Sequence, residues 1–315
     1  MLAGAQRHGT DHDVQRTDIQ PGIRGAPDGL KRLLAWLEYA GFRMVVGLLR
    51  VMPLDMSSAV SGWLWRSLAP FQRRHGRALQ NLAASMPELT PAQREAIIRD
   101  MWSMLGRTFA EALRIDEIVC DPARVEVDIP DDAMQAMRSG GFVIVSLHMG
   151  NWEIASPMLD RLGIPVAGLY QRIKNSLVDE FVTRMRRDHY RLGLFSKGHG
   201  SVTALMRILR QGGGITVLAD LRDHFGERVP FFGREAPSSP FPALLARGRH
   251  VPLLAGRVIR LEGCRFRVTA ELVPVAHTAD RAADVHATTA AIQAVFERWI
   301  RERPGQWMWG HRRWG

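Results

Sequence analysis

The sequence predicts an α/β protein with a mixed, largely parallel sheet flanked by helices, preceded by a helical region that associates with membranes. Two patterns lead to this prediction. From about residue 124 onward, apolar runs of strand length alternate with helical patterns. Before residue 72, the helical patterns are apolar around most of their circumference. With 315 residues, 46% of them hydrophobic and 23% charged, the chain is long enough to bury a substantial core.

The first 29 residues are rich in Gly, Asp, Arg and His and show no apolar period. We expect residues 1–29 to form a disordered tail. They lack the apolar segment of a signal peptide, and no uncharged apolar run of about 18 residues occurs in the chain. A standard membrane-spanning helix is therefore not expected.

Residues 30–52 predict a helix that lies in a membrane interface. At 100° per residue its charged side chains fall within an arc of roughly 140°, and the rest is mostly Leu, Val, Met and aromatic. Such a helix would be roughly 34 Å long, with its cations at the lipid headgroups. The alternative is an ordinary core helix. The charged residues are Lys31, Arg32, Glu38, Arg43 and Arg50.

The next segment, residues 55–71, adds Trp63, Trp65 and Phe71 to this apolar region, and Asp55 is its expected N-cap. The sequence thus predicts three parts: a tail over 1–29, membrane-associating helices over 30–71, and a catalytic domain over 72–315.

Within 72–315 the elements follow from periodicity and punctuation. A helical pattern covers 73–112, with Thr90 as N-cap and Pro91 in the first turn of its second helix. Gly212 to Gly214 follow a helix and precede a strand, which indicates a helix C-cap and loop rather than a phosphate loop. Strands are expected at 124–129, 142–147, 165–169, 214–219, 251–260 and 265–273, and helices at 131–139, 151–162, 175–192, 199–211, 239–248 and 284–302.

Charge and cysteine usage exclude several classes of site. The net charge is +10, which favours phosphates, acidic lipid headgroups or an acidic protein partner. The two cysteines, Cys120 and Cys264, are far apart, so a disulfide scaffold, a zinc ribbon or an iron–sulfur site is not expected. We expect no metal and no cofactor.

His148 is the first candidate for chemistry. It follows a buried-strand pattern over 142–147, and Met149, Gly150 and Asn151 form a turn before the next helix. Ligands of open α/β sheets bind outside the carboxyl ends of the strands, so His148 stands where a ligand is expected.

Glu153 follows His148 at a spacing that permits contact across the turn. A neutral imidazole can take a proton from an attacking hydroxyl, and a carboxylate on its other ring nitrogen would fix the tautomer. The His-x4-acid spacing alone is unspecific, since His8 and Asp13 share it. The alternative is a hydrogen-bonded histidine at a strand end without a catalytic role.

The sequence HMGNWE at 148–153 resembles the HFGNWE-type motif of the late lipid A acyltransferases, within the glycerol-phosphate and lysophospholipid acyltransferase superfamily. Further segments resemble the same family in the same order, so the resemblance runs from about residue 30 to 315. These segments are RALQNLAASMPELTPAQREAIIRDMWSMLGRTFAE at 77–111, LYQRIKNSLVDEF at 169–181, the stretch with PFFG at 215–246, and ERPGQWMWGHRRW at 302–314.

The resemblance implies a role for each matching residue. It makes His148 the general base, Glu153 its partner and Arg172 the cation at the donor carbonyl or a phosphate. Family members commonly read Tyr-Arg where this chain reads Tyr170-Gln171-Arg172. For Phe231 and Phe232 the alternative is a turn with two core phenylalanines. The residues expected to contact substrate are Asn151, Trp152, Asp220, Phe231, Phe232 and Gly233.

The resulting hypothesis is an acyltransferase that moves a fatty acyl group from acyl carrier protein, or from acyl-CoA, to a hydroxyl of a lipid A precursor. We expect it at the cytoplasmic face of the inner membrane, peripheral or monotopic. A basic cluster on a predicted helix is a candidate docking face for an acidic carrier protein or an anionic glycolipid, and the alternative is a solvated helix face. Its residues are Arg184, Arg186, Arg187 and Arg191. Alternatives are another lipid acceptor such as a lysophospholipid or a glycolipid, a thioesterase, and a membrane scaffold. A nucleic-acid-binding protein is not expected, because no RRM, KH or helix-turn-helix signature is present.

Overall fold

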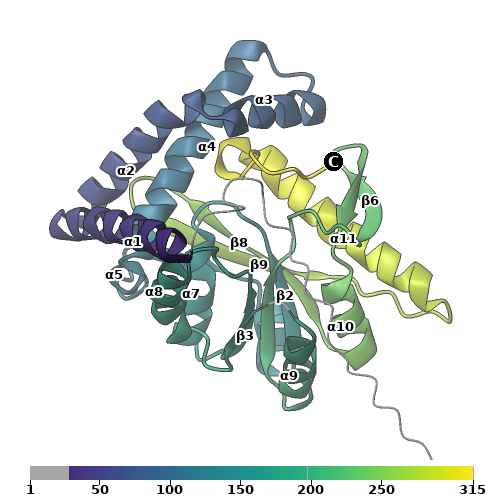
Figure 1. The fold of residues 1–315 in the computed structure, drawn as a ribbon. Helices are drawn as coiled ribbons and strands as arrows, with labels where there is room; N and C mark the ends of the chain where they lie inside the picture. The colour runs from purple at the N-terminus through teal and green to yellow at the C-terminus, as the bar shows by residue number, and fades with distance from the viewer. Residues whose placement is uncertain (1–27, 197, 315) are drawn as a thin grey trace, which may run out of the picture.

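The computed structural model describes residues 28–196 and 198–314. The tail expected over 1–29 therefore lies outside the described residues, except for Asp28 and Gly29, which begin the first helix. Figure 1 shows a central sheet with helices on both of its faces and a helical arm at one side. The α/β class predicted from the sequence is confirmed.

Seven strands form the central sheet. They are β1 (Val125–Asp128), β2 (Phe142–Ser146), β3 (Val166–Tyr170), β4 (Leu194–Ser196), β5 (Gly214–Leu218), β8 (Leu253–Arg260) and β9 (Phe266–Val273). Their order is β1-β9-β8-β2-β5-β3-β4. Every neighbouring pair is parallel except β8 and β9, which form an antiparallel hairpin. The sheet is thus mixed and largely parallel, as predicted.

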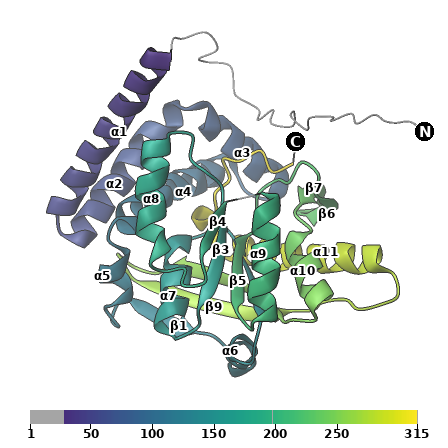
Figure 2. The same ribbon diagram turned by 60° about the horizontal axis from the view of Figure 1, so that its bottom comes forward.

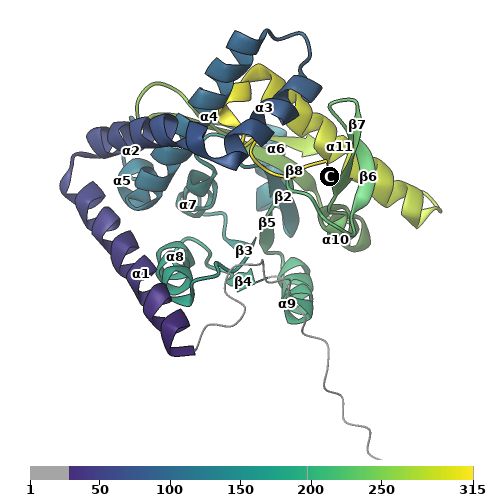
Figure 3. The ribbon, with the colours of Figure 1, turned by 45° about the horizontal axis from the view of Figure 1, so that its top comes forward.

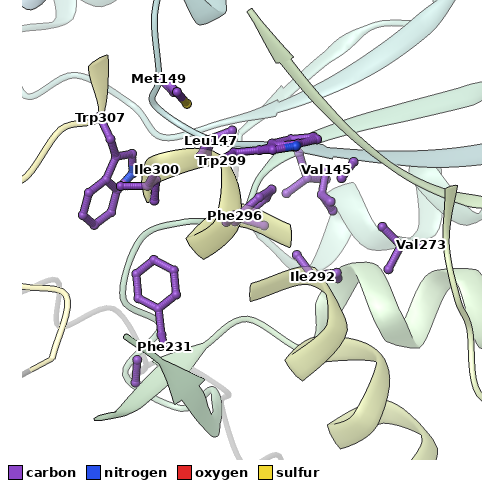
Figure 4. Close-up of a cluster of buried hydrophobic side chains, with 14 of the residues drawn as sticks. Val145, Leu147, Met149, Phe231, Val273, Ile292, Phe296, Trp299, Ile300 and Trp307 are labelled. Carbon is purple, nitrogen blue, oxygen red and sulfur yellow. The ribbon is translucent and has the colours of Figure 1, made fainter. Parts of the chain in front are cut away.

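Helices cover both faces because the strands bury side chains in both directions. They are α6 (Asp131–Arg138), α7 (Ala155–Arg161), α8 (Ser176–Arg187), α9 (His199–Arg210), α10 (Phe241–Arg249) and α11 (Arg281–Glu302), with a short 3-10 turn η3 (Pro304–Gln306). Val143 and Val145 of β2 pack toward α9, α10 and α11, whereas Phe142 and Ile144 pack toward α6 and α7. Figure 4 shows the first of these clusters.

The N-terminal helices form the arm. The elements are α1 (Asp28–Val51), α2 (Leu54–Leu68), η1 (Ala69–Phe71), α3 (Arg73–Ser85), α4 (Pro91–Ala112) and α5 (Ile115–Val119). The helix α1 lies at the edge of the molecule, alongside α8 and joined to α2 (Figures 2 and 3). Of the residues of α1 from Gly29 to Val51, whose exposure is described, Val46 and Leu49 are the buried ones. No described helix has the length and apolarity needed to cross a membrane.

The helices α2 and α4 cross at close range. A side chain at Gly106 would meet the carbonyl oxygen of Ser61 at 2.5 Å, so only glycine permits this approach. The Ser61 hydroxyl donates to the Gly106 carbonyl at 2.6 Å. Within the arm, α2 is therefore fixed closely against α4.

The structure confirms one local prediction made from the sequence and corrects others. Thr90 caps α4 through a capping box with Gln93, as predicted. Asp55 does not cap α2, because that helix begins one residue earlier and the carboxylate of Asp55 binds Arg124 instead. The helix expected over 151–162 begins with a 3-10 turn, η2 (Trp152–Ile154). The short strand β4 and the hairpin of β6 (Glu227–Phe231) and β7 (Arg234–Ser238) were not predicted.

Candidate active site

His148 and Asp220 occupy matching positions after two neighbouring strands. The strands β2 and β5 are parallel, with Ser146 opposite Leu218, and each polar residue lies two positions past its strand end. The imidazole Nδ1 of His148 is 2.8 Å from Oδ1 of Asp220, and the backbone N–H of His148 donates to Oδ2 at 2.9 Å. The register of the sheet thus brings together two residues that are 72 positions apart.

Asp220 is fully buried and remains ionised. Its carboxylate also accepts a hydrogen bond from the indole Nε1 of Trp307 at 2.9 Å. Burial acts to raise the pKa of Asp220, but the charge and hydrogen bonds of His148, together with Trp307, lower the pKa to about 2. An ionised carboxylate at Nδ1 requires a proton there, so Nε2 carries the free lone pair of neutral His148.

The turn after His148 is held by the C-terminal segment. Gly150 has a φ of +56°, and a side chain there would meet the carbonyl oxygen of Val258 at 2.0 Å, which excludes other residues. The backbone N–H of Gly150 donates to the carbonyl of Gln306 at 2.9 Å, and that of Met308 donates to the carbonyl of His148 at 3.2 Å. The imidazole is therefore anchored by its backbone as well as by Asp220.

Glu153 does not hold the ring of His148. Its carboxylate pairs with the guanidinium of Arg186 on α8, with 2.9 Å between Nε and Oε2, and accepts from the indole of Trp152 at 3.0 Å. The expected pairing of Glu153 with the imidazole is wrong, because the 3-10 turn η2 carries Glu153 toward α8 while Asp220 occupies Nδ1. Burial acts to lower the pKa of Arg186, but the negative charge and the hydrogen bonds of Glu153 raise that pKa above its ordinary value.

A cavity of about 390 Å³ opens beside His148. The rings of Trp152 and His311, which line it, lie 5.0 Å and 6.2 Å from the His148 ring between centroids. Glu153 and Arg186 are among its polar lining residues. The remaining wall is mostly apolar and comes from α1, α2, α4 and α8, including Phe42, Trp65, Leu105, Phe109, Val182 and Met185.

A histidine paired with a buried carboxylate and lying beside an apolar cavity suits the transfer of a hydrophobic group. The family model for bacterial lipid A biosynthesis acyltransferases matches residues 28–315. This chain belongs to that family. It is 25% identical over 247 residues to the lipid A biosynthesis myristoyltransferase of Escherichia coli (strain K12), a match that covers 74% of this chain and 72% of that protein. The protein is therefore an acyltransferase of lipid A biosynthesis, as the sequence motifs indicated.

Three side chains of the acyltransferase that were expected to contact substrate lie away from the cavity. Asn151 is fully buried, caps η2 and donates to Glu111 at 2.8 Å. Phe231 and Phe232 are buried in the main core, against Trp307, Trp309 and Trp314. Each of these three side chains fills the interior of the fold and lies outside the lining of the cavity.

Gly233 also has a structural role in the acyltransferase. Phe232 and Gly233, with φ of +54° and +67°, form the two-residue turn between β6 and β7. Positive φ at both central residues matches the twist of a tight hairpin, and glycine adopts it without strain. The predicted substrate contact at Gly233 is therefore replaced by a turn, which is the alternative that the sequence left open for this segment.

The remaining predicted residues divide between the site and the surface. Trp152 lines the cavity, and Asp220 lies below His148 where a substrate does not reach it. Arg172 is exposed in the loop after β3, and no hydrogen bond or ion pair joins it to another described residue. Arg186 lines the cavity instead. The sequence analysis assigned Arg186 to a basic helix face and did not predict that it lines the cavity. The signal in the sequence was its position four residues after Val182, which places both side chains on the same face of the helix.

Proposed function

We propose that the acyltransferase moves a fatty acyl group from a thioester donor, acyl carrier protein or acyl-CoA, to a hydroxyl of a lipid A precursor, with His148 as general base. The acceptor is the hydroxyl of an existing 3-hydroxyacyl chain. The observation that carries this proposal is the His148–Asp220 pair beside an apolar cavity. An imidazole with a free Nε2 and a carboxylate on Nδ1 is the arrangement that general-base catalysis requires.

The reaction proceeds by direct transfer. Nε2 of His148 takes the proton of the acceptor hydroxyl as its oxygen attacks the thioester carbonyl, which forms a tetrahedral intermediate. The imidazolium that results is stabilised by the ionised carboxylate of Asp220. The intermediate then expels the thiolate of the donor, which takes the proton from Nε2. An ester and a free thiol result, and no covalent enzyme intermediate is needed.

Arg186 is our candidate for the cation that stabilises the developing oxyanion, in place of Arg172. Its guanidinium lines the cavity and is held from two nitrogens by Glu153. A fixed cation near a developing negative charge lowers the barrier because it needs no reorganisation. In this proposal, Glu153 is a positioning residue for Arg186 rather than for His148.

The apolar cavity is the proposed site for the acyl chain of the donor. Its walls carry aromatic and aliphatic side chains from four helices, and Glu153 and Arg186 belong to the same lining. Trp152 links them to the histidine, because it donates to Glu153 and its ring lies 5.0 Å from that of His148 between centroids. A chain lying in the cavity would present its thioester carbon near these polar residues. Burial of each methylene contributes about 0.8 kcal/mol to binding, so chain length affects affinity strongly.

We also propose that residues 30–71 associate with the membrane and that 72–315 form the catalytic part, at the cytoplasmic face of the inner membrane. The support is a set of large apolar side chains that α1, α2 and η1 leave exposed. The most exposed of them are Trp36, Met44, Leu48, Val51, Trp63, Leu68 and Phe71. Exposed apolar surface of this extent is typical of a membrane or partner contact.

The membrane contact predicts the behaviour of a triple variant. Trp36, Leu48 and Trp63 are 58%, 59% and 64% exposed, so replacing all three by glutamate costs little packing. Because burying one such side chain contributes about 1.5–3 kcal/mol, we expect binding to anionic vesicles in a flotation assay to fall at least tenfold. Phe225→Glu, at a side chain that is 98% exposed outside this region, is the matched control. Unchanged flotation of the triple variant would contradict the contact.

The transfer assay tests the function itself. Detergent-extracted protein is incubated with acyl carrier proteins of several chain lengths, or acyl-CoA, and a tetra-acylated lipid A precursor, and products are read by mass spectrometry. We expect a mass gain of one acyl group that depends on His148. Transfer only to lysophospholipids or other glycolipids would reassign the acceptor. Release of free acid at a rate unaffected by any acceptor would identify a thioesterase.

A further inference from the structure

We propose that Arg74 and Arg77, on the helix α3, bind a phosphate group on the headgroup of the lipid acceptor. This inference rests on the proposed function and adds a binding site to it. The site lies at the rim of the cavity, where α3 meets the C-terminal segment. Arg74 lines the cavity together with Gly310 and His311.

The contacts between α3 and the C-terminal segment define the position of this site. The guanidinium of Arg77 donates to the carbonyl of Gly310 at 3.2 Å, and the amide of Asn81 donates to the carbonyl of His311 at 2.9 Å. The backbone of Arg74 lies against Gly310. Arg74 and His311 line the same cavity, and the ring of His311 lies 6.2 Å from that of His148 between centroids. A group bound at Arg74 would therefore lie on the cavity wall that leads toward His148.

The charges at this rim have no acidic partner within the described residues. Among residues 28–196 and 198–314, no ion pair or side-chain hydrogen bond involves Arg74, and Arg77 binds a backbone carbonyl alone. By contrast, Arg66 on α2 pairs with Asp100 and Arg186 in the same cavity pairs with Glu153. Arg73 and Arg312, which lack carboxylate partners as well, add to the positive charge. Guanidinium groups without a protein anion are suited to a phosphate.

The unfavourable electrostatics of these unpaired arginines support a bound anion at this position. The first turn of α3 carries two arginines and no acidic residue, at the helix end where positive charge is unfavourable. The ring of His311 responds to the same charges. Burial, and after it the charges of His148, Arg74 and Arg77, lower the pKa of His311 to about 4, although Asp220 acts to raise it. A bound phosphate would offset this repulsion.

On the neighbouring surface, apolar residues lie next to basic ones, just as the acyl chains of a lipid acceptor lie next to its charged headgroup. Leu68 and Phe71, which are 60% and 87% exposed, lie shortly before Arg74 in the chain. Acyl chains would lie against the apolar residues, and the charged headgroup would lie at α3. A phosphate at this rim could also come from bulk membrane phospholipid, and the experiment below separates the two sources.

The test compares acceptors that differ only in phosphate. KM is measured in detergent micelles for the tetra-acylated lipid A precursor and for the same lipid after phosphatase treatment, with wild type, Arg74→Gln, Arg77→Gln and the double variant. We expect removal of phosphate to raise KM at least tenfold for wild type and less than threefold for the double variant. Arg138→Gln, on α6 at the opposite end of β2, is the control, and we expect it to retain the wild-type ratio.

A measurement of equilibrium binding makes the phosphate test independent of catalytic turnover. The affinity of the His148→Ala protein for the two lipids is measured by equilibrium binding in micelles, with and without Arg74→Gln, so a failure of acyl transfer leaves the phosphate test intact. Equal loss for both lipids, or no loss, would overturn the proposal. If Arg74→Gln weakens binding to phosphatidylglycerol vesicles but leaves the affinity for the micellar precursor unchanged, the arginines bind bilayer phospholipid and the assignment to the acceptor is wrong.

Discussion

Replacement of His148 by alanine is expected to lower kcat for acyl transfer by about three to four orders of magnitude, and Asp220→Asn by about two to four. A positioned general base contributes about 10²–10⁴. Removing the carboxylate of such a pair leaves the wrong tautomer and costs a comparable factor. In this protein, the Asp220→Asn substitution would present a neutral amide to Nδ1, so Nε2 would lose its basic form and the imidazolium its counter-charge.

The measurement is single-turnover transfer at saturating donor, with thermal unfolding as the folding control. The substitution Glu153→Gln would keep His148 and Asp220 paired but release Arg186, so this variant separates the roles of the two carboxylates. If Asp220→Asn retains more than a tenth of wild-type kcat while Glu153→Gln abolishes a base-dependent pH profile, the carboxylate that serves His148 is Glu153 and the proposed roles are reversed.

Loss of Glu111 is expected to destabilise the protein by about 3–5 kcal/mol. Its carboxylate is fully buried and binds the guanidinium of Arg260 from two oxygens, so α4 is joined to β8 at this point. Ser58 donates to the same carboxylate at 2.6 Å and Asn151 at 2.8 Å. Glu111→Ala would leave a buried guanidinium without a counter-ion, which is the costly way to break such a pair.

Urea denaturation checks this expectation. The double variant Glu111→Leu/Arg260→Met removes both charges and should recover at least half of the lost stability, because no charge then remains unpaired. Arg298→Ala breaks an exposed pair with Glu271, and we expect a change of about 0–1 kcal/mol there. A loss below about 1 kcal/mol for Glu111→Ala would show that water or rearrangement compensates Arg260.

Local sequence patterns determined most of the long elements and the chemical character of the site, although they did not predict β4 or the hairpin of β6 and β7. The apolar run over 142–147 contains the strand β2, and the helix-start signal at Thr90 and Pro91 coincides with the beginning of α4. His148, which follows β2, lies at the carboxyl end of the sheet. These features depend on residues within a few positions of one another, since hydrogen-bonding periodicity and capping are local interactions. The family resemblance followed from the same short motifs, and the family match confirmed it.

Tertiary structure alone decided the partners. Which strand lies beside β2 is set by long-range pairing, and the choice of β5 brings Asp220 to His148 across 72 positions. The nearby Glu153 pairs with Arg186 because α8 packs over η2. Phe231 and Phe232 show the same limit, since an apolar residue carries no local sign of whether it faces a ligand or the core. Contacts between distant segments depend on how faces are buried, and a sequence read locally does not contain that information.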